Sequence, residues 1–330
     1  MNYRPIYQYD DRGRFIAQHQ TLTHASRAIG CNESSLRKPL HTKDLVKVRN
    51  YYFSFNKVDH LHRNIVNEFT PPIPHKANIL VLDIEIAPTE AYVWGLWKQN
   101  VAINQIIEDY YILSYSCKWL LEPDVYSSAL TSNEAILKDD SRLVNELWRF
   151  LDSADIIIAY NGAYFDVRVM NTRFLLYGLK PTSTYQVIDP LATCKNQFRF
   201  SSNKFDYVLR YLGLGGKREH EGFEMWAKCT HGDKDALHEM ELYNRTDVIK
   251  LEDLYMVLRP WIKPHPNMGL FIDEKVSACP TCGSTKLVFN GYYHTPMNRY
   301  EEFRCEECGA VGRSRFALKK FNGLLSSVPR

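Results

Sequence analysis

The sequence predicts an α/β protein, with one mixed sheet covered by helices, a small α+β module before it and a short β region after it. First, apolar runs alternate with helically spaced segments between residues 78 and 262, which is typical of a sheet with helices on its faces. Second, residues 5–55 combine alternating apolar residues with two short amphipathic stretches. Third, two C-x-x-C pairs follow, at 279–282 and 305–308.

The chain is expected to contain several structural units, because 330 residues exceed the length of one average domain. The predicted organisation is a module at 1–55, a linker at 56–77, a core domain at 78–262 and a cysteine-containing domain at 263–330. The linker lacks strong periodicity and finishes in the proline-rich stretch TPPIPHK. We find no apolar run of about 18 residues and no N-terminal signal pattern, so we expect a cytoplasmic protein without a membrane partner.

Charge is distributed unevenly along the chain. Residues 1–77 carry 12 Lys/Arg against 6 Asp/Glu, and residues 262–330 carry 10 against 6. The segment between them carries 19 basic and 26 acidic residues. Basic flanks around an acidic centre favour an anionic polymer that is held by the flanking modules and processed at an acidic, metal-binding site. Ordinary solvated surface charge is the alternative interpretation.

Within the core, five apolar runs predict strands and four amphipathic segments predict helices. The strands are expected at 78–86, 109–120, 125–130, 155–161 and 185–189. The helices are expected at 140–154, 166–179, 203–215 and 235–262. The first three strands are expected to be antiparallel and to be followed by mixed αβ units, which gives one α/β sheet flanked by helices.

Acidic and polar side chains from three separate segments of the core carry the functional prediction. Asp83 and Glu85 stand two residues apart in the strand NILVLDIEI, so their side chains leave the same face. In YNGAYFD, Asn161 and Asp166 follow a strand at its carboxyl end, where α/β sheets bind ligands.

The third segment, YNRTD, lies in the last predicted helix of the core. Its Tyr243 and Asp247 are four residues apart, so both side chains project from one helix face. Four carboxylates and a phenol suit phosphodiester hydrolysis by two divalent cations, because carboxylates are hard ligands and two ions can stabilise both the attacking and the leaving oxygen. The phenol could orient the attacking water.

These motifs, in this order, resemble the DEDD superfamily of ribonuclease-H-like 3′–5′ exonucleases, and the tyrosine spacing is similar to its DEDDy branch. The stretches IIAYNGAYFDVRVMNTRFLLYG and MELYNRTDVIKLEDLY are especially similar to phage and bacterial members. The resemblance covers roughly residues 78–262. It implies that Asp83, Glu85, Asp166 and Asp247 bind Mg²⁺ or Mn²⁺ and that Tyr243 orients water. It also implies that Asn161 contacts substrate or supports the second motif.

Other residues near these motifs are less specific. Lys204, Arg210 and Lys217 fall where such enzymes meet the substrate backbone, although helix-surface charge explains them equally well. Asp189 precedes a proline and is expected in a turn. Trp226 is expected to pack rather than to stack on a base.

The C-terminal cysteines resemble a zinc ribbon. Each C-x-x-C-G knuckle supplies two soft ligands, and the glycine after each pair permits the tight turn. The predicted ligands are Cys279, Cys282, Cys305 and Cys308. Because four thiolates close the coordination sphere, the zinc ion is expected to be structural. The segment between the knuckles reads as a hairpin and residues 310–319 as a closing strand. Nearby tyrosines and arginines could contact nucleic acid or protein, and the sequence does not decide between the two.

The N-terminal module resembles small DNA-binding modules that are appended to homing endonucleases. A hairpin around residues 10–13 is followed by a short helix at 21–30 and a second, basic helix at 32–40. This arrangement predicts a helix-turn-helix-like unit in which Arg37 and Lys38 contact nucleic acid. A protein-docking helical module is the alternative. None of the usual endonuclease motifs is present.

The sequence therefore predicts a divalent-metal-dependent 3′–5′ exonuclease that releases nucleoside 5′-monophosphates. It would use two Mg²⁺ or Mn²⁺ ions and one structural Zn²⁺, and it would act in a bacterial cell or a phage-infected host. DNA is favoured over RNA as substrate because of the N-terminal module, and a replication or repair polymerase is a possible partner. The alternatives are an RNA exonuclease, a structure-selective endonuclease, or a polymerase-accessory proofreading subunit.

Overall fold

The computed structural model describes residues 5–10, 15–42, 45–49, 51–57, 77–272, 276–318 and 325. The chain forms two compact units, residues 1–75 and 76–330, each of which is described by itself. Most of the predicted linker, and most of the predicted turn at 10–13, lies outside the described residues. Among the helices that are described, none combines the length and the apolar character that a membrane crossing requires.

The first unit is a four-stranded antiparallel sheet with two helices packed on one face. Its sheet order is β2-β1-β4-β3. Its elements are β1 (Ile6–Tyr9), β2 (Phe15–His19), α1 (Leu22–Ala28), α2 (Ser34–Thr42), β3 (Leu45–Val48) and β4 (Tyr51–Ser54). Thr21 begins α1 by accepting a hydrogen bond from the backbone N–H of His24. The buried Ala25 and Leu36 of the helices pack against Phe53 of the sheet.

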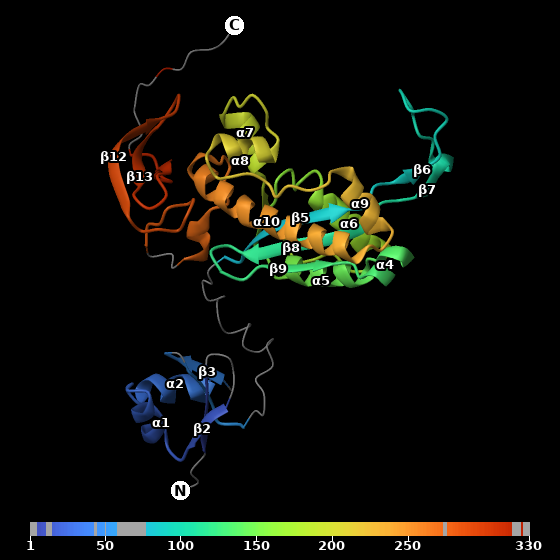
Figure 1. The fold of residues 1–330 in the computed structure, drawn as a ribbon. Helices are drawn as coiled ribbons and strands as arrows, with labels where there is room; N and C mark the ends of the chain where they lie inside the picture. The colour runs from blue at the N-terminus through green and yellow to red at the C-terminus, as the bar shows by residue number, and fades with distance from the viewer. Residues whose placement is uncertain are drawn as a thin grey trace. The chain divides into compact units, whose positions relative to one another are not determined.

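The second unit is built on a five-stranded mixed sheet, which confirms the predicted α/β fold class (Figure 1). The sheet order is β11-β10-β5-β8-β9. Its strands are β5 (Ile79–Ile86), β8 (Ile112–Trp119), β9 (Tyr126–Ala129), β10 (Ile156–Ile158) and β11 (Gln186–Ile188). The strands β5, β8 and β9 are antiparallel, whereas β10 and β11 run parallel to β5. The central strand β5 therefore joins the antiparallel half of the sheet to the parallel half.

Helices cover both faces of this sheet. The even-numbered residues of β5, such as Leu80 and Leu82, join a buried cluster with Leu143 and Met170 from two of the helices. Those helices are α5 (Ser141–Asp152) and α6 (Asp166–Leu176). The odd-numbered residues, such as Val81, face the long helix α10 (Lys234–Leu258). Asp83 and Glu85 share this second face, because side chains alternate along a strand.

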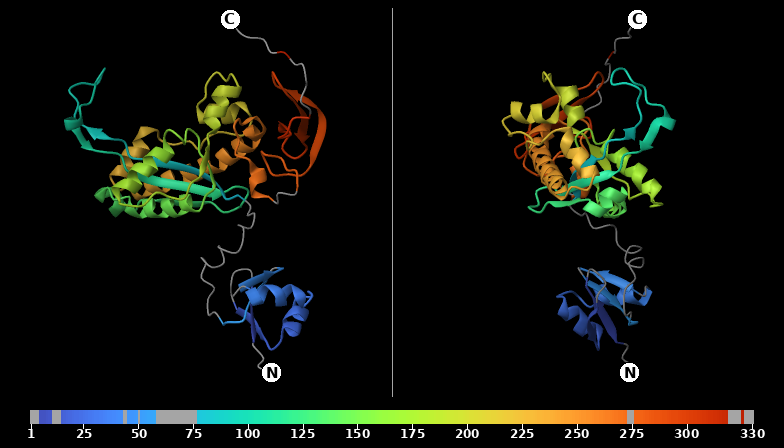
Figure 2. Two further views of the ribbon diagram at one scale, coloured as in Figure 1. Left: turned by 180° about the vertical axis from the view of Figure 1, so that it is seen from behind. Right: turned by 45° about the vertical axis from the view of Figure 1, so that its right-hand side comes forward.

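Several short elements were not predicted. The helices that were not predicted are α4 (Ser132–Leu137), α7 (Pro190–Gln197) and α9 (Phe223–Thr230). The short helix α8 (Phe205–Tyr211) was predicted. The 3₁₀ turns are η1 (Ile103–Gln105), η2 (Arg259–Trp261) and η3 (Met268–Phe271). A hairpin of β6 (Glu90–Ala91) and β7 (Ile106–Glu108) projects away from the core in all three views (Figures 1 and 2). Its tip exposes Trp94 by 97% and Trp97 by 86%.

The C-terminal region is rich in β structure, as predicted. Three antiparallel strands form a sheet in the order β12-β13-β14. They are β12 (Leu287–His294), β13 (Arg299–Cys305) and β14 (Val311–Arg313). This sheet lies at the end of the second unit opposite the β6–β7 hairpin (Figure 2). Its buried centre consists of Cys279, Cys305 and Ala310, with the other two paired cysteines packed around them.

Candidate active site

Three of the predicted catalytic carboxylates meet between β5 and α10. Oxygen atoms of Asp83, Glu85 and Asp247 all lie within 4.8 Å of one another. In the ladder with β8, Asp83 lies opposite Ser116 and Glu85 opposite Ser114, so the strand beside them carries small side chains. Asp247 is only 2% exposed, because α10 packs directly against the sheet. The two-residue period of β5 and the packing of α10 thus create the cluster.

Asp166 lies beside these three residues, at the start of α6. It is 2% exposed, and its Oδ1 accepts a hydrogen bond of 3.3 Å from the backbone N–H of Ile84, between the two acids of β5. The acids of β5 and Asp166 are therefore tied together through the backbone of the strand.

The turn that precedes α6 is fixed by backbone conformation and by Asp189. Asn161 adopts a left-handed φ of 65°, and its backbone N–H donates to Asp189 Oδ1 at 2.9 Å. A side chain at Gly162 would place a Cβ 2.2 Å from Cβ of Ala159, so the turn requires glycine there. Asp189 also accepts from the N–H of Leu191 and thereby begins α7. The expected turn aspartate is thus the N-cap of a helix that the sequence analysis missed.

Burial and mutual repulsion raise the free energy of the ionised carboxylates and so favour their protonated forms. Burial, followed by the charges of Glu85, Asp166 and Asp247, raises the pKa of Asp83 well above its ordinary value. Burial also raises the pKa of Glu85 and of Asp166 to about 7, and it raises the pKa of Asp247 despite the nearby Lys217. Such a site favours the binding of cations, because each added positive charge offsets repulsion that the fold cannot relieve.

Lys217 supplies one positive charge to this cluster. Its Nζ donates to Asp247 Oδ2 at 2.5 Å and to the hydroxyl of Tyr243 at 2.7 Å. It also lies 4.8 Å from the centroid of the Tyr243 ring and 5.4 Å from that of Phe205. Burial disfavours the lysine's charge, but Asp247 and Tyr243 outweigh burial and raise its pKa. From the sequence, substrate contact and helix-surface charge were both open for Lys217. Neither predicts its pairing with Asp247 from a segment between α8 and α9.

Two further residues lie close to the acids of β5. Asn244, next to Tyr243 in the chain, is fully buried, and its Nδ2 donates to Asp83 Oδ2 at 2.5 Å. Trp226 of α9 lies close enough to Glu85 to favour its ionised form, although burial outweighs this effect and raises the pKa of Glu85. Trp226 was expected to pack, and it does so against Tyr243, with ring centroids 6.0 Å apart. Its contact with a carboxylate could not be predicted, because α9 itself was missed.

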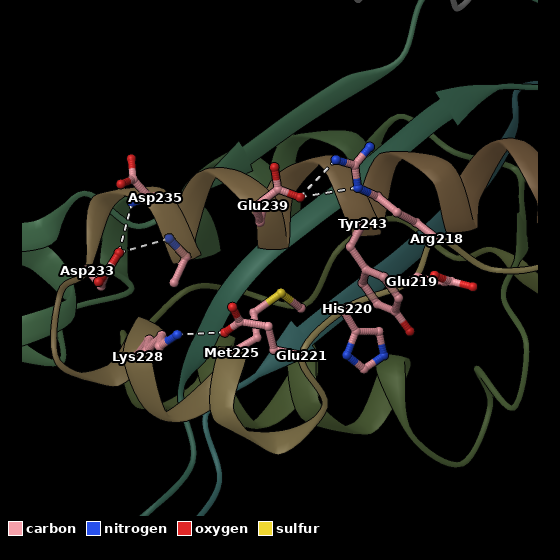
Figure 3. Close-up of a pocket in the computed structure, with 11 residues that line it drawn as sticks. Arg218, Glu219, His220, Glu221, Met225, Lys228, Asp233, Asp235, Glu239 and Tyr243 are labelled. Atoms are coloured by element: carbon pink, nitrogen blue, oxygen red, sulfur yellow. Dashed lines mark hydrogen bonds and ion pairs between the residues drawn. The ribbon is translucent and has the colours of Figure 1, made fainter.

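A cavity of about 590 Å³ lies beside Tyr243, between α10 and the segment that leads into α9. Tyr243 and His220 lie side by side at one end of it, and Lys228 and Asp233 lie at the other (Figure 3). The rings of His220 and Tyr243 meet edge to face, 4.9 Å apart. Asp83, Glu85 and Asp247 do not line this cavity themselves, so Tyr243 is what connects it to their cluster.

The donor set fits hard divalent cations. Asp247 Oδ1 is buried, and within the described part of the chain it has no hydrogen-bond partner, so a lone pair is left for a ligand. Carboxylate oxygens that converge from a strand and a helix are the ligands that Mg²⁺ and Mn²⁺ prefer. Lys217 alone cannot balance the acids of β5 together with Asp166 and Asp247. The residues present thus fit the metal that the sequence predicts.

The four paired cysteines form a second group with the composition of a metal site. Their Sγ atoms all lie within 4.8 Å of one another. Cys279 and Cys308 are 3.7 Å apart, and Cys282 and Cys305 are 3.6 Å apart, which is far beyond disulfide length. The geometry is therefore that of four separate thiol ligands around a common centre, as a Cys₄ zinc site requires.

The predicted substrate-binding residues lie outside the carboxylate cluster. Lys204 is exposed at the N-cap position of α8. Arg37 and Lys38 are exposed on α2 in the first unit, opposite the buried Leu36. Arg37 forms an ion pair with Glu33 one turn earlier on the helix. Their contacts with nucleic acid stay predictions.

Comparison with known proteins identifies the class of the core. Residues 124–259 match the model of the RNase_H superfamily. The match takes in Asp166, Tyr243 and Asp247 and begins after β5. Together with the mixed sheet, it shows that the chain contains a ribonuclease-H-like domain, which is a nuclease fold.

No particular curated protein matches the chain. Among solved structures, it is similar to the family B DNA polymerase from the hyperthermophilic archaeon Pyrobaculum calidifontis, with 14% sequence identity and a TM-score of 0.41. The similarity covers 71% of this chain and 32% of the polymerase chain, so this protein spans about a third of the polymerase's length.

Proposed function

We propose that the protein is a divalent-metal-dependent 3′–5′ exonuclease that hydrolyses DNA and releases nucleoside 5′-monophosphates. The observation that carries this proposal is the convergence of Asp83, Glu85 and Asp247 within 4.8 Å, beside a tyrosine that faces a cavity. Asp166 completes the acidic set through its hydrogen bond to β5. When bound, two Mg²⁺ or Mn²⁺ ions would activate water and stabilise the charge that develops on the phosphate.

The protein's own residues would position the reactants. Burial and the charge of Asp247 raise the pKa of Tyr243, so its hydroxyl stays protonated at neutral pH. Because that oxygen already accepts a hydrogen bond from Lys217, the phenol is fixed in orientation and can direct a water molecule without acting as a base. Asn244 holds Asp83 in place through its hydrogen bond, and Trp226 favours the ionised form of Glu85.

The reaction would break one phosphodiester bond at a time. Water attacks the phosphorus of the terminal nucleotide, the bond to the 3′ oxygen of the preceding nucleotide breaks, and that oxygen takes up a proton. The products are a nucleoside 5′-monophosphate and a strand with a new 3′ hydroxyl. Asn161 and Lys204 would contact the strand near the site.

We further propose four parts for the chain: a DNA-binding module at 1–55, a linker at 56–77, the exonuclease domain at 78–262 and a zinc ribbon at 263–330. The exposed Arg37 and Lys38 of α2 support nucleic-acid binding by the first part. Because helices of this kind fit the major groove, they favour DNA over RNA. The Cys₄ group supports structural zinc in the last part.

Digestion of 5′-labelled oligonucleotides tests the activity. With Mg²⁺, single-stranded DNA should yield a ladder that shortens from the 3′ end, and Asp83→Ala should abolish it. Asp253→Ala is the matched control, because that carboxylate also lies on α10 but its side chain is 45% exposed. Parallel reactions with duplex DNA and RNA identify the preferred substrate. Internal cleavage would indicate an endonuclease, faster digestion of RNA an RNA exonuclease, and binding without cleavage a polymerase-accessory subunit.

A further inference from the structure

The C-terminal sheet carries a face on which tyrosine rings and an arginine stack. Tyr293 of β12 lies directly opposite Tyr300 of β13, with ring centroids 6.4 Å apart. The guanidinium carbon of Arg313, on β14, lies 3.9 Å from the centroid of Tyr300 and 5.6 Å from that of Tyr293. We call these three residues the Tyr–Arg face. It crosses all three strands of the sheet, because the three residues lie on β12, β13 and β14 in turn.

The packing of the sheet does not require this face. The buried centre of the region is formed by the cysteines and Ala310, at the other end of the strands. Tyr293 is 45% exposed, and Arg313 is also exposed. A metal-bound Cys₄ group would hold the sheet together without help from exposed rings. Tyr300 is partly exposed, with the Arg313 guanidinium against its ring, so the three residues together form a surface that a partner can reach.

The charge of the face indicates what kind of partner fits. Within the described residues, Arg313 and its neighbour Arg315 form no ion pair, although Glu302 lies opposite Arg313 in the strand register. Lys286, near the cysteine end, is instead paired with Glu307 at 3.0 Å. Arg313 and Arg315 thus leave positive charge available at and near the Tyr–Arg face, which favours an anionic partner.

We propose that the Tyr–Arg face binds unpaired nucleotides of a nucleic acid strand. Tyrosine rings and a guanidinium plane are the surfaces on which bases stack, and the N–H groups of a stacked arginine remain free to contact phosphate. Arg315 supplies a second cation two residues further along the chain. This inference rests on the proposed function in taking nucleic acid as the ligand, and it assigns the C-terminal sheet the task of holding single-stranded substrate. It favours nucleic acid over protein as the partner of this sheet, a choice that the sequence left open.

Binding of a fluorescent oligothymidylate of about 20 nucleotides to the full-length protein, without added divalent ions, tests the proposal through fluorescence anisotropy. Tyr300→Ala should weaken binding about fivefold or more, as the loss of one stacked base predicts. Tyr300→Phe retains the ring and should retain the affinity. Lys286→Gln is the matched control, since it removes a paired cation from the residue just before β12, and it should leave binding unchanged.

The salt dependence separates stacking from charge. Arg313→Gln should reduce the slope of log K against log [KCl] by about 0.7, the value for one phosphate contact on a single strand, whereas Tyr300→Ala should leave the slope unchanged. If Arg313→Gln and Tyr300→Ala both bind with wild-type affinity and slope, the proposal is wrong. Because Arg313 is exposed, its variant keeps the test valid even if Tyr300→Ala disturbs the sheet.

Hydrolysis of thymidine 5′-(4-nitrophenyl phosphate), a substrate with one nucleotide, distinguishes this inference from the proposed activity. Variants of the Tyr–Arg face should hydrolyse it at the wild-type rate while they lose affinity for the oligonucleotide. If the wild-type protein fails to hydrolyse it but the variants still lose oligonucleotide binding, the binding face stands and the exonuclease proposal fails.

Discussion

Replacing Lys217 by methionine should destabilise the metal-free protein, because the substitution leaves Asp247 as a buried carboxylate without its cation. Methionine keeps much of the length and apolar volume of the lysine stem, so the change removes mainly charge. Asp247 is 2% exposed and the Lys217 side chain 27%, which makes this a largely buried pair.

The expected magnitude follows from the geometry. At the observed 2.5 Å between Lys217 Nζ and Asp247 Oδ2, the Coulomb attraction is about 7 kcal/mol with an effective dielectric constant of about 20. The desolvation of both groups opposes much of this energy, and the loss of one partner from a buried pair costs about 3–5 kcal/mol. We expect about 3 kcal/mol, because part of the lysine reaches solvent. For a unit of this size the melting temperature should fall by about 6–12 °C.

Urea unfolding at pH 8 in the presence of a chelator measures the effect. Lys250→Met is the matched control: its side chain is also 27% exposed, but its partner Asp253, 3.4 Å away, is 45% exposed. An exposed pair of this kind is worth less than about 1 kcal/mol. Added Mg²⁺ should restore about 2.7 kcal/mol to Lys217→Met at a hundred times its dissociation constant. The reasoning is refuted if Lys217→Met loses no more stability than Lys250→Met.

Three further predictions concern the two metal-binding groups. Asp83→Asn should lower kcat/KM on single-stranded DNA at least about a hundredfold, since a metal ligand that helps to stabilise transition-state charge is worth several kcal/mol. Steady-state kinetics with Mg²⁺ measures this effect. An undiminished rate would show that Asp83 is not a catalytic residue. Burial raises the pKa of Glu85 and Asp166 to about 7 in the metal-free fold. Between about pH 4 and 7 the folded protein therefore keeps protons on these carboxyls that the unfolded chain has already lost. The free energy of unfolding of the metal-free protein should fall as pH rises through that window. Mg²⁺ should therefore raise the melting temperature more at pH 8 than at pH 5, and equal shifts would contradict the assignment. Cys279→Ser should reduce bound zinc well below one ion per chain, as measured by mass spectrometry, without slowing hydrolysis of the one-nucleotide substrate; unchanged zinc content would exclude the Cys₄ site.

The sheet could be predicted because burial follows the sequence pattern there. The run at 79–82 is entirely buried, and so are the three isoleucines of β10, so uninterrupted apolar runs marked both central strands. The helices α5 and α10 were recognised because their apolar residues recur at helical spacing. The β6–β7 hairpin gave no such signal, since residues at its tip, such as Trp94, are exposed. A pattern that reports burial cannot predict an element that buries little.

The short helices were not predicted for a different reason. In α7, Asp189 and Pro190 were interpreted as a turn, yet an aspartate N-cap followed by proline at the first helical position is equally a helix start. Eight residues offer too few turns for the apolar spacing to decide between the two. Tertiary contact decides, because Asp189 also accepts a hydrogen bond from the backbone of Asn161.

The acids of the candidate site could be predicted from regular geometry, whereas their partners could not. Asp83 and Glu85 share a face because a strand has a period of two, and Tyr243 and Asp247 share one because helix neighbours are four residues apart. Lys217 obeys neither rule, since it reaches Asp247 from a segment between two helices. When a residue's position depends on the path of an irregular segment, its sequence shows no periodicity from which that position could be predicted.

This difference bears on how the site would work. The acids are fixed by the strand β5 and the helix α10, so their spacing is set by the core of the domain. Their counter-charge comes from Lys217, a partly exposed side chain with four rotatable bonds on an irregular segment. When divalent ions bind, its contact with Asp247 can be exchanged for the metal, while its bond to Tyr243 and the positions of the carboxylates are kept. A rigid set of acids with an exchangeable countercharge can therefore remain folded in both states, which explains why a core strand tolerates two neighbouring carboxylates.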